Sequence, residues 1–155
     1  MRCVGVRCER PARLEGLAEV DAAVDDLEAA VRWADIVSCA TLADTPLVHG
    51  AWLRPGQHLD LIGSFTPQMR EADDDALARA AVYVDTRAGA LADSGELVHA
   101  LATGVLTTED IRGDLAELVR GTVIGRRGSA EITLFKSVGC ALEDLAAAEL
   151  AVSGA

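Results

Sequence analysis

Aromatic side chains are scarce in this chain of 155 residues: they make up 3% of the sequence, although half of it is apolar. The hydrophobic core must therefore consist mainly of alanine, leucine and valine. Lysine is nearly absent too, since Lys136 is the single lysine among 14 basic residues and the others are arginines. We attribute the preference for arginine and alanine to a GC-rich genome rather than to function.

Features that would indicate a membrane protein or a metalloprotein are missing as well. No apolar run reaches the roughly 18 residues that a membrane-spanning helix needs, and the sequence begins without a signal peptide. Cys3, Cys8, Cys39 and Cys140 form no Cys-x-x-Cys pair and no ligand-like spacing with a histidine, so we expect buried structural thiols and no metal site. Free cysteines fit a reducing compartment, and we expect a soluble, cytoplasmic protein.

Positive charge is in deficit. The chain has 25 acidic and 14 basic residues and a net charge of −11, which argues against nucleic acid and anionic membranes as partners. Its length allows one domain with a real core and leaves little room for a second.

Segments of strand and helix alternate along the chain. A capping-box pattern at Asp25 and Glu28 starts one helix, and Ser94 and Thr107 or Thr108 are expected to start others. The expected strands span residues 1–8, 22–24, 36–40, 58–63, 82–86 and 132–135. The expected helices span residues 11–20, 26–33, 76–81 and 138–152, with two or three short helices within 87–121. This alternation predicts an α/β fold with a mostly parallel sheet, flanking helices and a long C-terminal helix.

In such sheets ligands bind beyond the carboxyl ends of the strands, so the residues that follow each strand are candidates for a site. Glu9 and Arg10 follow the first expected strand. A glutamate there can accept hydrogen bonds from both ribose hydroxyls of an adenosine, and an arginine can pair with a 2′-phosphate, so the choice between NAD and NADP stays open. Alternatively, both residues are solvated charges ahead of a helix that begins at Pro11.

The next two strands are also followed by candidate residues. Thr41 either brings a hydroxyl to a cofactor or forms a cap or turn. In the run Gly63-Ser64-Phe65-Thr66-Pro67, glycine permits a flat ring to approach the backbone and proline fixes the exit of the chain, although a tight turn between strand and helix explains the same residues. Arg70 and Glu71 either orient an anionic substrate or form a surface ion pair.

The last expected strand runs into Lys136, Ser137, Val138 and Gly139. Ser137 and the free amides at the start of the following helix can hold an amide or a phosphate group, or else Ser137 simply caps that helix. The sequence contains no recognisable Gly-x-Gly-x-x-Gly turn, Walker loop, Ser/His/Asp triad or pair of catalytic carboxylates. No residue is therefore assigned a catalytic or a substrate-binding role.

Taken together, these segments resemble the ornithine cyclodeaminase/mu-crystallin family. The resemblance rests on Ala34-Asp35-Ile36-Val37 with Ala40-Thr41, Arg54-Pro55-Gly56, Gly63-Ser64-Phe65-Thr66-Pro67 with Arg70-Glu71, Val82-Tyr83-Val84-Asp85-Thr86, and Phe135-Lys136-Ser137-Val138-Gly139 with Glu143-Asp144. Each piece is weak by itself, but their order and spacing match along almost the whole chain, from the second strand of that family's Rossmann domain to its C-terminal helix.

The resemblance implies an NAD(P)-dependent homodimer with two domains, in a family that includes ornithine cyclodeaminases, alanine dehydrogenases and reductases of cyclic ketimines. Their shared chemistry is hydride exchange between a nicotinamide and the carbon of a C–N bond next to a carboxylate. The substrate would be a small cyclic imino acid or an amino acid. By resemblance, the cofactor-binding residues are Glu9, Arg10, Thr41, Gly63, Ser64, Phe65, Ser137 and Gly139, with Glu9 and Arg10 at the adenosine end.

Phe65 departs from part of the family. In the cyclodeaminase and alanine dehydrogenase branches, the matching position holds a catalytic aspartate. Phenylalanine can neither relay a proton nor bind an ammonium by charge, so ornithine cyclodeamination proper is the disfavoured alternative. The run from Gly63 to Glu71 instead resembles the branch of ketimine reductases that act on pyrroline-2-carboxylate.

The family's N-terminal half is missing from this sequence, including the dimerisation and substrate domain, the first Rossmann strand and its Gly-rich turn. We therefore expect residues 1–155 to form a single, partial Rossmann-like NAD(P)-binding domain of a truncated oxidoreductase that binds its cofactor weakly. Whether the chain is an enzyme stays open. The alternatives are a non-catalytic nucleotide- or small-ligand-binding protein, an inactive remnant, or one half of a split protein with a separate N-terminal partner. The sheet edge left by the missing strand predicts self-association.

Overall fold

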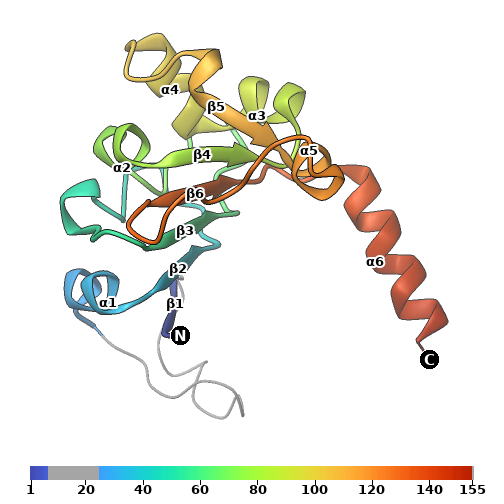
Figure 1. Cartoon of the computed structure of the whole chain (residues 1–155), viewed down its shortest axis with the longest axis horizontal. Helices are drawn as coiled ribbons and strands as arrows, with labels where there is room; N and C mark the ends of the chain where they lie inside the picture. Colours follow the sequence, from blue (N-terminus) through green and yellow to red (C-terminus); the bar gives the residue numbers. More distant parts are fainter. Residues whose placement is uncertain (7–24, 155) are drawn as a thin grey trace.

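The computed structural model describes residues 1–6 and 25–154, and in them six strands form one sheet (Figure 1). All neighbouring strands run parallel, in the spatial order β1-β2-β3-β6-β4-β5. The strands are β1 (Cys3–Val6), β2 (Ile36–Cys39), β3 (His58–Leu61), β4 (Ala81–Val84), β5 (Ile111–Asp114) and β6 (Thr133–Lys136). The α/β fold and the parallel sheet expected from the sequence are confirmed. The last strand of the chain, β6, lies in the middle of the sheet.

Helices connect the strands, and most of them begin at a capping side chain. Asp26, Asp73, Thr86, Ser94 and Asp114 each accept a hydrogen bond from an amide in the first turn that follows. The helices are α1 (Leu27–Trp33), α2 (Asp74–Arg79), α3 (Arg87–Asp93), α4 (Gly95–Ala102), α5 (Leu115–Arg120) and α6 (Ala141–Ser153), with 3₁₀ turns η2 (Gly50–Trp52) and η3 (Thr108–Asp110). The start at Ser94 is confirmed, whereas the cap of α1 is Asp26 rather than Asp25.

One strand lies where the sequence predicted short helices. The Thr107–Asp110 capping box starts a single 3₁₀ turn, and the chain then enters β5, where Ile111 pairs with Val82 of β4. Burial of Ile111 against the core favours this pairing over a longer helix. Tertiary contact therefore overrides a correct local start signal.

The long C-terminal helix also begins later than expected, at Ala141 rather than near Val138. The amides of Val138 and Gly139 donate to the carboxylate of Asp85, and Gly139 has φ +84°, which ends regular backbone there. The N-cap of α6 is Cys140, so the prediction that Ser137 caps this helix is wrong. The expected helix over 11–20 and strand over 22–24 lie outside the described residues.

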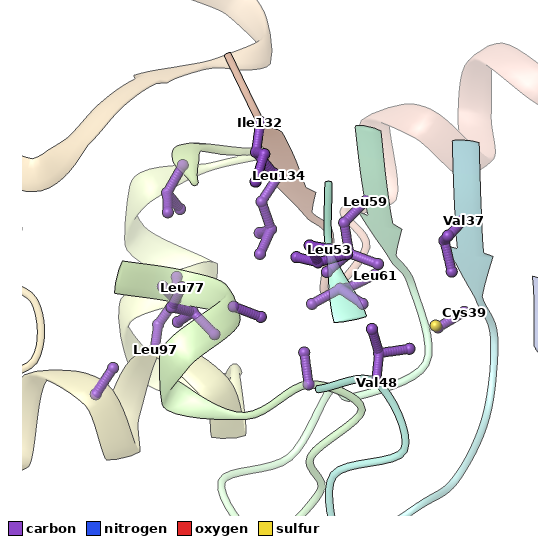
Figure 2. Packing of buried hydrophobic residues seen from close by; sticks show 14 of the residues in the cluster. Val37, Cys39, Val48, Leu53, Leu59, Leu61, Leu77, Leu97, Ile132 and Leu134 are labelled. Atoms are coloured by element: carbon purple, nitrogen blue, oxygen red, sulfur yellow. The ribbon is translucent and has the colours of Figure 1, made fainter. Parts of the chain in front are cut away.

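The core lies on one face of the sheet, and Figure 2 shows its leucine and valine side chains packed together. Leu59, Leu61 and Leu134 of the central strands project onto this face, because in-register neighbours of parallel strands point the same way. Leu77 of α2 and Leu97 of α4 cover them. The cluster of buried residues consists of valine, leucine, isoleucine and alanine with Cys39, as the scarcity of aromatic residues predicts.

The cysteines are buried less uniformly than expected. Cys39 lies fully in the core, and its burial raises the pKa of its thiol. Cys3 is exposed and Cys140 is half-buried, so the expectation of buried thiols is wrong for these two. Cys3 points away from the core because it alternates with Val4 and Val6 on β1. Cys8 lies outside the described residues.

Helix α6 projects away from the rest of the molecule (Figure 1). None of its 13 residues is buried, and four of its apolar side chains are largely exposed: Leu142, Leu145, Leu150 and Val152. No helix in the described part of the chain is both long and apolar enough to cross a bilayer. The apolar side of α6 is thus exposed among the described residues.

Candidate functional site

Four strands end side by side at the carboxyl edge of the sheet. The last residues of these strands pair in register. Cys39 of β2 pairs with Leu61 of β3, and Lys136 of β6 pairs with Leu61 and with Val84 of β4. The segments that follow them are therefore brought together at this edge. They contain Thr41, Gly63, Ser64, Phe65, Ser137 and Gly139, so the structure unites six of the eight residues expected from the sequence.

Glu71 joins the first two of these segments. Its side chain is fully buried, and its carboxylate accepts hydrogen bonds from the amide of Thr41 at 2.6 Å, from the hydroxyl of Thr41 at 2.9 Å and from the amide of Gly63 at 2.9 Å. Glu71 is therefore not part of a surface ion pair, one of the two alternatives, and its role in orienting a substrate stays a prediction. Arg70 instead pairs with Asp74, at 2.5 Å.

Gly63 is packed tightly against the same residues. A Cβ atom at this position would lie 2.0 Å from the carbonyl oxygen of Thr41 and 2.3 Å from a carboxylate oxygen of Glu71. The glycine therefore permits a close approach of the protein's own backbone on this side, and the approach of a flat ring stays a prediction.

Glu96, in the first turn of α4, supports the next segment. It is almost fully buried and accepts hydrogen bonds from the amide of Glu71 at 2.6 Å and from the hydroxyls of Ser64 and Ser94. The sequence analysis missed this residue. An acidic side chain two positions after a capping serine reads as an ordinary helix-start charge, and only the fold turns it inward.

Lys136 lies beneath both glutamates. Its side chain is fully buried, its ammonium donates to the carbonyl oxygen of Leu61 at 3.1 Å, and it lies 4.0 Å from a carboxylate oxygen of Glu96. Burial lowers the pKa of Lys136 from its ordinary value, and the nearby charges of Glu96 and Glu71 oppose this effect.

Asp85 organises the other side of the edge. Its carboxylate accepts hydrogen bonds from the hydroxyl of Ser137 at 2.9 Å and from the amides of Val138 and Gly139 at 2.8 Å each. The amides that the sequence offered to a phosphate or amide group are thus bonded within the protein.

Apolar side chains lie exposed above this buried polar layer. Leu42, Ile62 and Phe65 are 69%, 42% and 47% exposed, and they follow the ends of β2 and β3. Thr41 and Ser64 are buried, and Thr41 also accepts a hydrogen bond from the amide of Ala43, as a turn-forming residue does. The segments at this edge therefore carry exposed apolar side chains and are held in place by buried carboxylates.

Glu9 and Arg10 lie outside the described residues, so the predicted adenosine end stays a prediction. A separate surface hollow of about 770 Å³ lies beside β5 and is lined by Arg87, Leu91, Thr108, Glu109, Asp110, Ile111, Arg112 and Arg127. It contains none of the expected site residues, and two of its arginines already pair with Glu117 and Glu131. Within residues 1–6 and 25–154, no three histidine, cysteine or acidic side chains gather as metal ligands would.

Comparison with known proteins identifies the relatives of this chain. A family model described as "Ornithine cyclodeaminase/mu-crystallin family" matches residues 8–153. The Delta(1)-pyrroline-2-carboxylate reductase of Paracoccus denitrificans is 49% identical over 149 residues, which cover 92% of this chain and 47% of the reductase. The ketimine reductase mu-crystallin of Mus musculus is 36% identical, over 80% of this chain and 37% of that protein.

A solved structure resembles the fold closely. The Delta(1)-pyrroline-2-carboxylate reductase of Thermococcus litoralis, in complex with NADH and L-proline, superposes with a TM-score of 0.80 at 38% identity, over 83% of this chain and 40% of the other. The chain thus spans less than half the length of each of these three relatives.

Proposed function

The chain belongs to the ornithine cyclodeaminase/mu-crystallin family, and on this premise we propose that it forms the nicotinamide-binding part of an NAD(P)H-dependent oxidoreductase that reduces a cyclic ketimine such as pyrroline-2-carboxylate. A similar reductase has been solved with NADH bound. The observation that carries the proposal is the exposure of three apolar side chains, Leu42, Ile62 and Phe65, in the segments that follow β2 and β3 at the carboxyl edge, where parallel sheets bind cofactors.

The nicotinamide end of the cofactor fits this surface. A planar ring would lie against Phe65 and Ile62, while Thr41, Gly63 and Ser64 hold the loops beneath it through Glu71 and Glu96. A bound NADH would supply the hydride for reduction of the C=N bond. The contribution of the chain is to position the ring and to exclude water from one of its faces. Because the amides of Val138 and Gly139 already donate to Asp85, we propose that other groups bind the cofactor's diphosphate.

The acidic residues of the edge support reduction over deamination. Glu71, Glu96 and Asp85 are all buried and accept hydrogen bonds from protein groups. Phe65 occupies the exposed position at which a cyclodeaminase by resemblance carries its aspartate. The iminium carbon of a cyclic ketimine is already electrophilic, so hydride transfer to it depends chiefly on orientation.

We further propose that residues 1–155 form one partial domain, which binds NADH or NADPH weakly by itself and needs groups from another segment for catalysis. Two observations support this: the relatives are more than twice as long as the matched region, and α6 presents four apolar side chains with nothing packed on them among the described residues. The other segment can be linked to the chain or be a separate partner. The unpaired thiols of Cys3, Cys39 and Cys140 support a cytoplasmic location.

Calorimetry of the full chain with NADH and with NADPH tests cofactor binding. We expect saturable but weak binding to at least one of them. Complete lack of binding to both would favour an inactive remnant, or one half of a split protein that needs its partner to bind cofactor.

A complementation assay tests the reaction. The chain is mixed with the N-terminal half of the Paracoccus denitrificans reductase, and oxidation of NADH is followed by absorbance with pyrroline-2-carboxylate as substrate. We expect reduction only in the mixture, and none with ornithine. Binding of NADH without any reduction in the mixture would favour a non-catalytic nucleotide-binding protein, the alternative suggested by the resemblance to mu-crystallin.

A further inference from the structure

Lys136 is the single lysine of the chain, and it lies in an apolar row of the sheet. The neighbours that pair with it in register are Leu61 on β3 and Val84 on β4, and Cys39 continues the row on β2. All four side chains are fully buried. Burial of an ammonium group in such a row is costly unless the charge is paired and hydrogen-bonded, so its presence calls for a specific role.

The contacts of Lys136 lead directly to the candidate site. Its ammonium donates to the carbonyl oxygen of Leu61, two residues before Gly63, and lies 4.0 Å from Glu96. Glu96 in turn accepts hydrogen bonds from Ser64 and from the amide of Glu71.

Glu71 continues this connection to Thr41 and Gly63. Three of the expected site residues are thus held by two buried carboxylates, and the ammonium of Lys136 lies closest to one of them. Arg70, which directly precedes Glu71 in the chain, pairs with Asp74 instead. Lys136 therefore supplies positive charge to a cluster that would otherwise hold two buried negative charges.

An arginine could not replace it. A guanidinium presents five N–H donors in a rigid plane, whereas the pocket offers the ammonium one carbonyl oxygen and one carboxylate. This explains why a chain that uses arginine at its 13 other basic positions has lysine here.

We propose that Lys136 is the positioning residue of the candidate site: through Glu96 and Glu71 it sets the loops that carry Thr41, Gly63 and Ser64 against the nicotinamide ring. The identity of the ligand in this proposal rests on the proposed function. The claim that Lys136 positions the loops does not depend on it. Lys136 itself touches neither cofactor nor substrate.

The test compares Lys136→Met with Leu134→Ala in the full chain. Leu134 lies two residues earlier on the same face of β6, is equally buried, and makes purely apolar contacts. NADH affinity is measured by calorimetry. Protection of the amides of Thr41, Gly63 and Glu71 is measured by hydrogen exchange. Each variant is measured at a temperature equally far below its own unfolding midpoint. We expect Lys136→Met to weaken NADH binding and to speed exchange of these amides about tenfold more than Leu134→Ala does.

The double variant Lys136→Met/Glu96→Gln provides the matched rescue. Removal of the unbalanced carboxylate charge should restore part of the affinity and of the amide protection, so the two substitutions should be less than additive. Additive losses, or equal effects of Lys136→Met and Leu134→Ala, would overturn the proposal. If the wild-type chain does not bind NADH, the proposed function fails, while the exchange rates still decide whether Lys136 positions these loops.

A variant that keeps Lys136 covers the case in which Lys136→Met does not fold. Because the chain has one lysine, labelling with ε-¹³C-lysine gives a single side-chain signal whose titration can be followed by NMR. In Glu96→Gln the pKa of Lys136 should fall further, since the charge that favours the ammonium is gone. An unchanged titration midpoint would show that Glu96 does not act on Lys136 and would also overturn the proposal.

Discussion

The hydroxyl groups of Thr41, Ser64 and Ser137 each donate a hydrogen bond to a different buried carboxylate. Thr41 bonds to Glu71, Ser64 to Glu96 and Ser137 to Asp85. At the scale of single residues, these side chains hold backbone in place and keep no hydroxyl hydrogen free to donate to a ligand. Their lone pairs and the neighbouring backbone are what a cofactor can use.

Substitution of Gly63 tests how tightly the loops are packed. Gly63→Ala places a Cβ atom 2.0 Å from the carbonyl oxygen of Thr41, so the loops must separate. We expect the free energy of unfolding to fall by about 1–3 kcal/mol, as in overpacked cores. Gly128→Ala is the control, because a Cβ atom there meets nothing within 4 Å. Urea denaturation measures both variants, and equal stability would contradict the tight packing at Gly63.

Substitution of Asp85 tests the second carboxylate. One carboxylate oxygen of Asp85 accepts three hydrogen bonds, and the other accepts one from the amide of Thr86. In Asp85→Asn the side-chain NH₂ group takes the place of one of these oxygens, so it must face a donor group of the protein. We expect a loss of about 2 kcal/mol in unfolding free energy, the scale of hydrogen bonds to a charged group. The exposed Asp44→Asn should change it by less than about 0.5 kcal/mol. Thermal and urea denaturation that fail to separate the two variants would refute this role of Asp85.

At the scale of elements, polar side chains fasten the corner between α1 and β2 to the rest of the sheet. Gln57 is fully buried and donates to the carbonyl oxygens of Val31 and Ala34 at the end of α1. Asp35, just before β2, accepts hydrogen bonds from Arg2 and Arg54. These contacts close the carbonyl end of the helix and fix where β2 begins.

The acid sensitivity of this corner follows from Asp35. Hydrogen bonds from Arg2 and then Arg54 hold the pKa of its carboxyl well below the ordinary value of 3.8. A depressed pKa in the folded state stabilises the fold above pH 3.8, and this contribution is lost as the pH falls below that value. We expect urea midpoints to fall less steeply below about pH 4 in Asp35→Asn than in the wild type. Parallel curves for Asp35→Asn and wild type would contradict this, and the exposed Asp93→Asn serves as control.

At the scale of the whole molecule, three surfaces are candidates for contact with other chains. Two are the edge strands β1 and β5, with nothing paired on their outer sides among the described residues, and the third is the projecting helix α6. Unpaired strand edges and exposed apolar helix faces both favour association. The self-association expected from the sequence therefore has a second structural source.

Solution scattering over a concentration series tests this association. We expect the apparent mass of the wild type to rise with concentration, and the triple variant Leu142→Gln/Leu145→Gln/Leu150→Gln to reduce the rise. The fold should tolerate the change, because α6 has no buried residue. A wild type that stays a monodisperse monomer would refute the prediction. A rise that the triple variant leaves unchanged would point to the sheet edges, β1 or β5, instead.

The sequence by itself determined the features that act over a few residues. Ser94 caps a helix, the apolar runs of 36–40 and 58–63 contain parallel strands, and the polar residues after them mark one edge of the sheet. Such signals are local, because capping and alternation depend on neighbours within a turn or a strand.

Only the tertiary structure decided what lies beneath that edge. Insertion of β6 between β3 and β4 brings Lys136 beside Leu61 and Val84, and the packing of α4 brings Glu96 to Ser64 and Lys136. In the sequence, Lys136 is a residue at the end of a strand and Glu96 is an acidic residue in the first turn of a helix, and nothing in the sequence indicates that they lie close together. Their burial, and the charge balance that follows from it, arises from contacts between segments that are 32 or more residues apart.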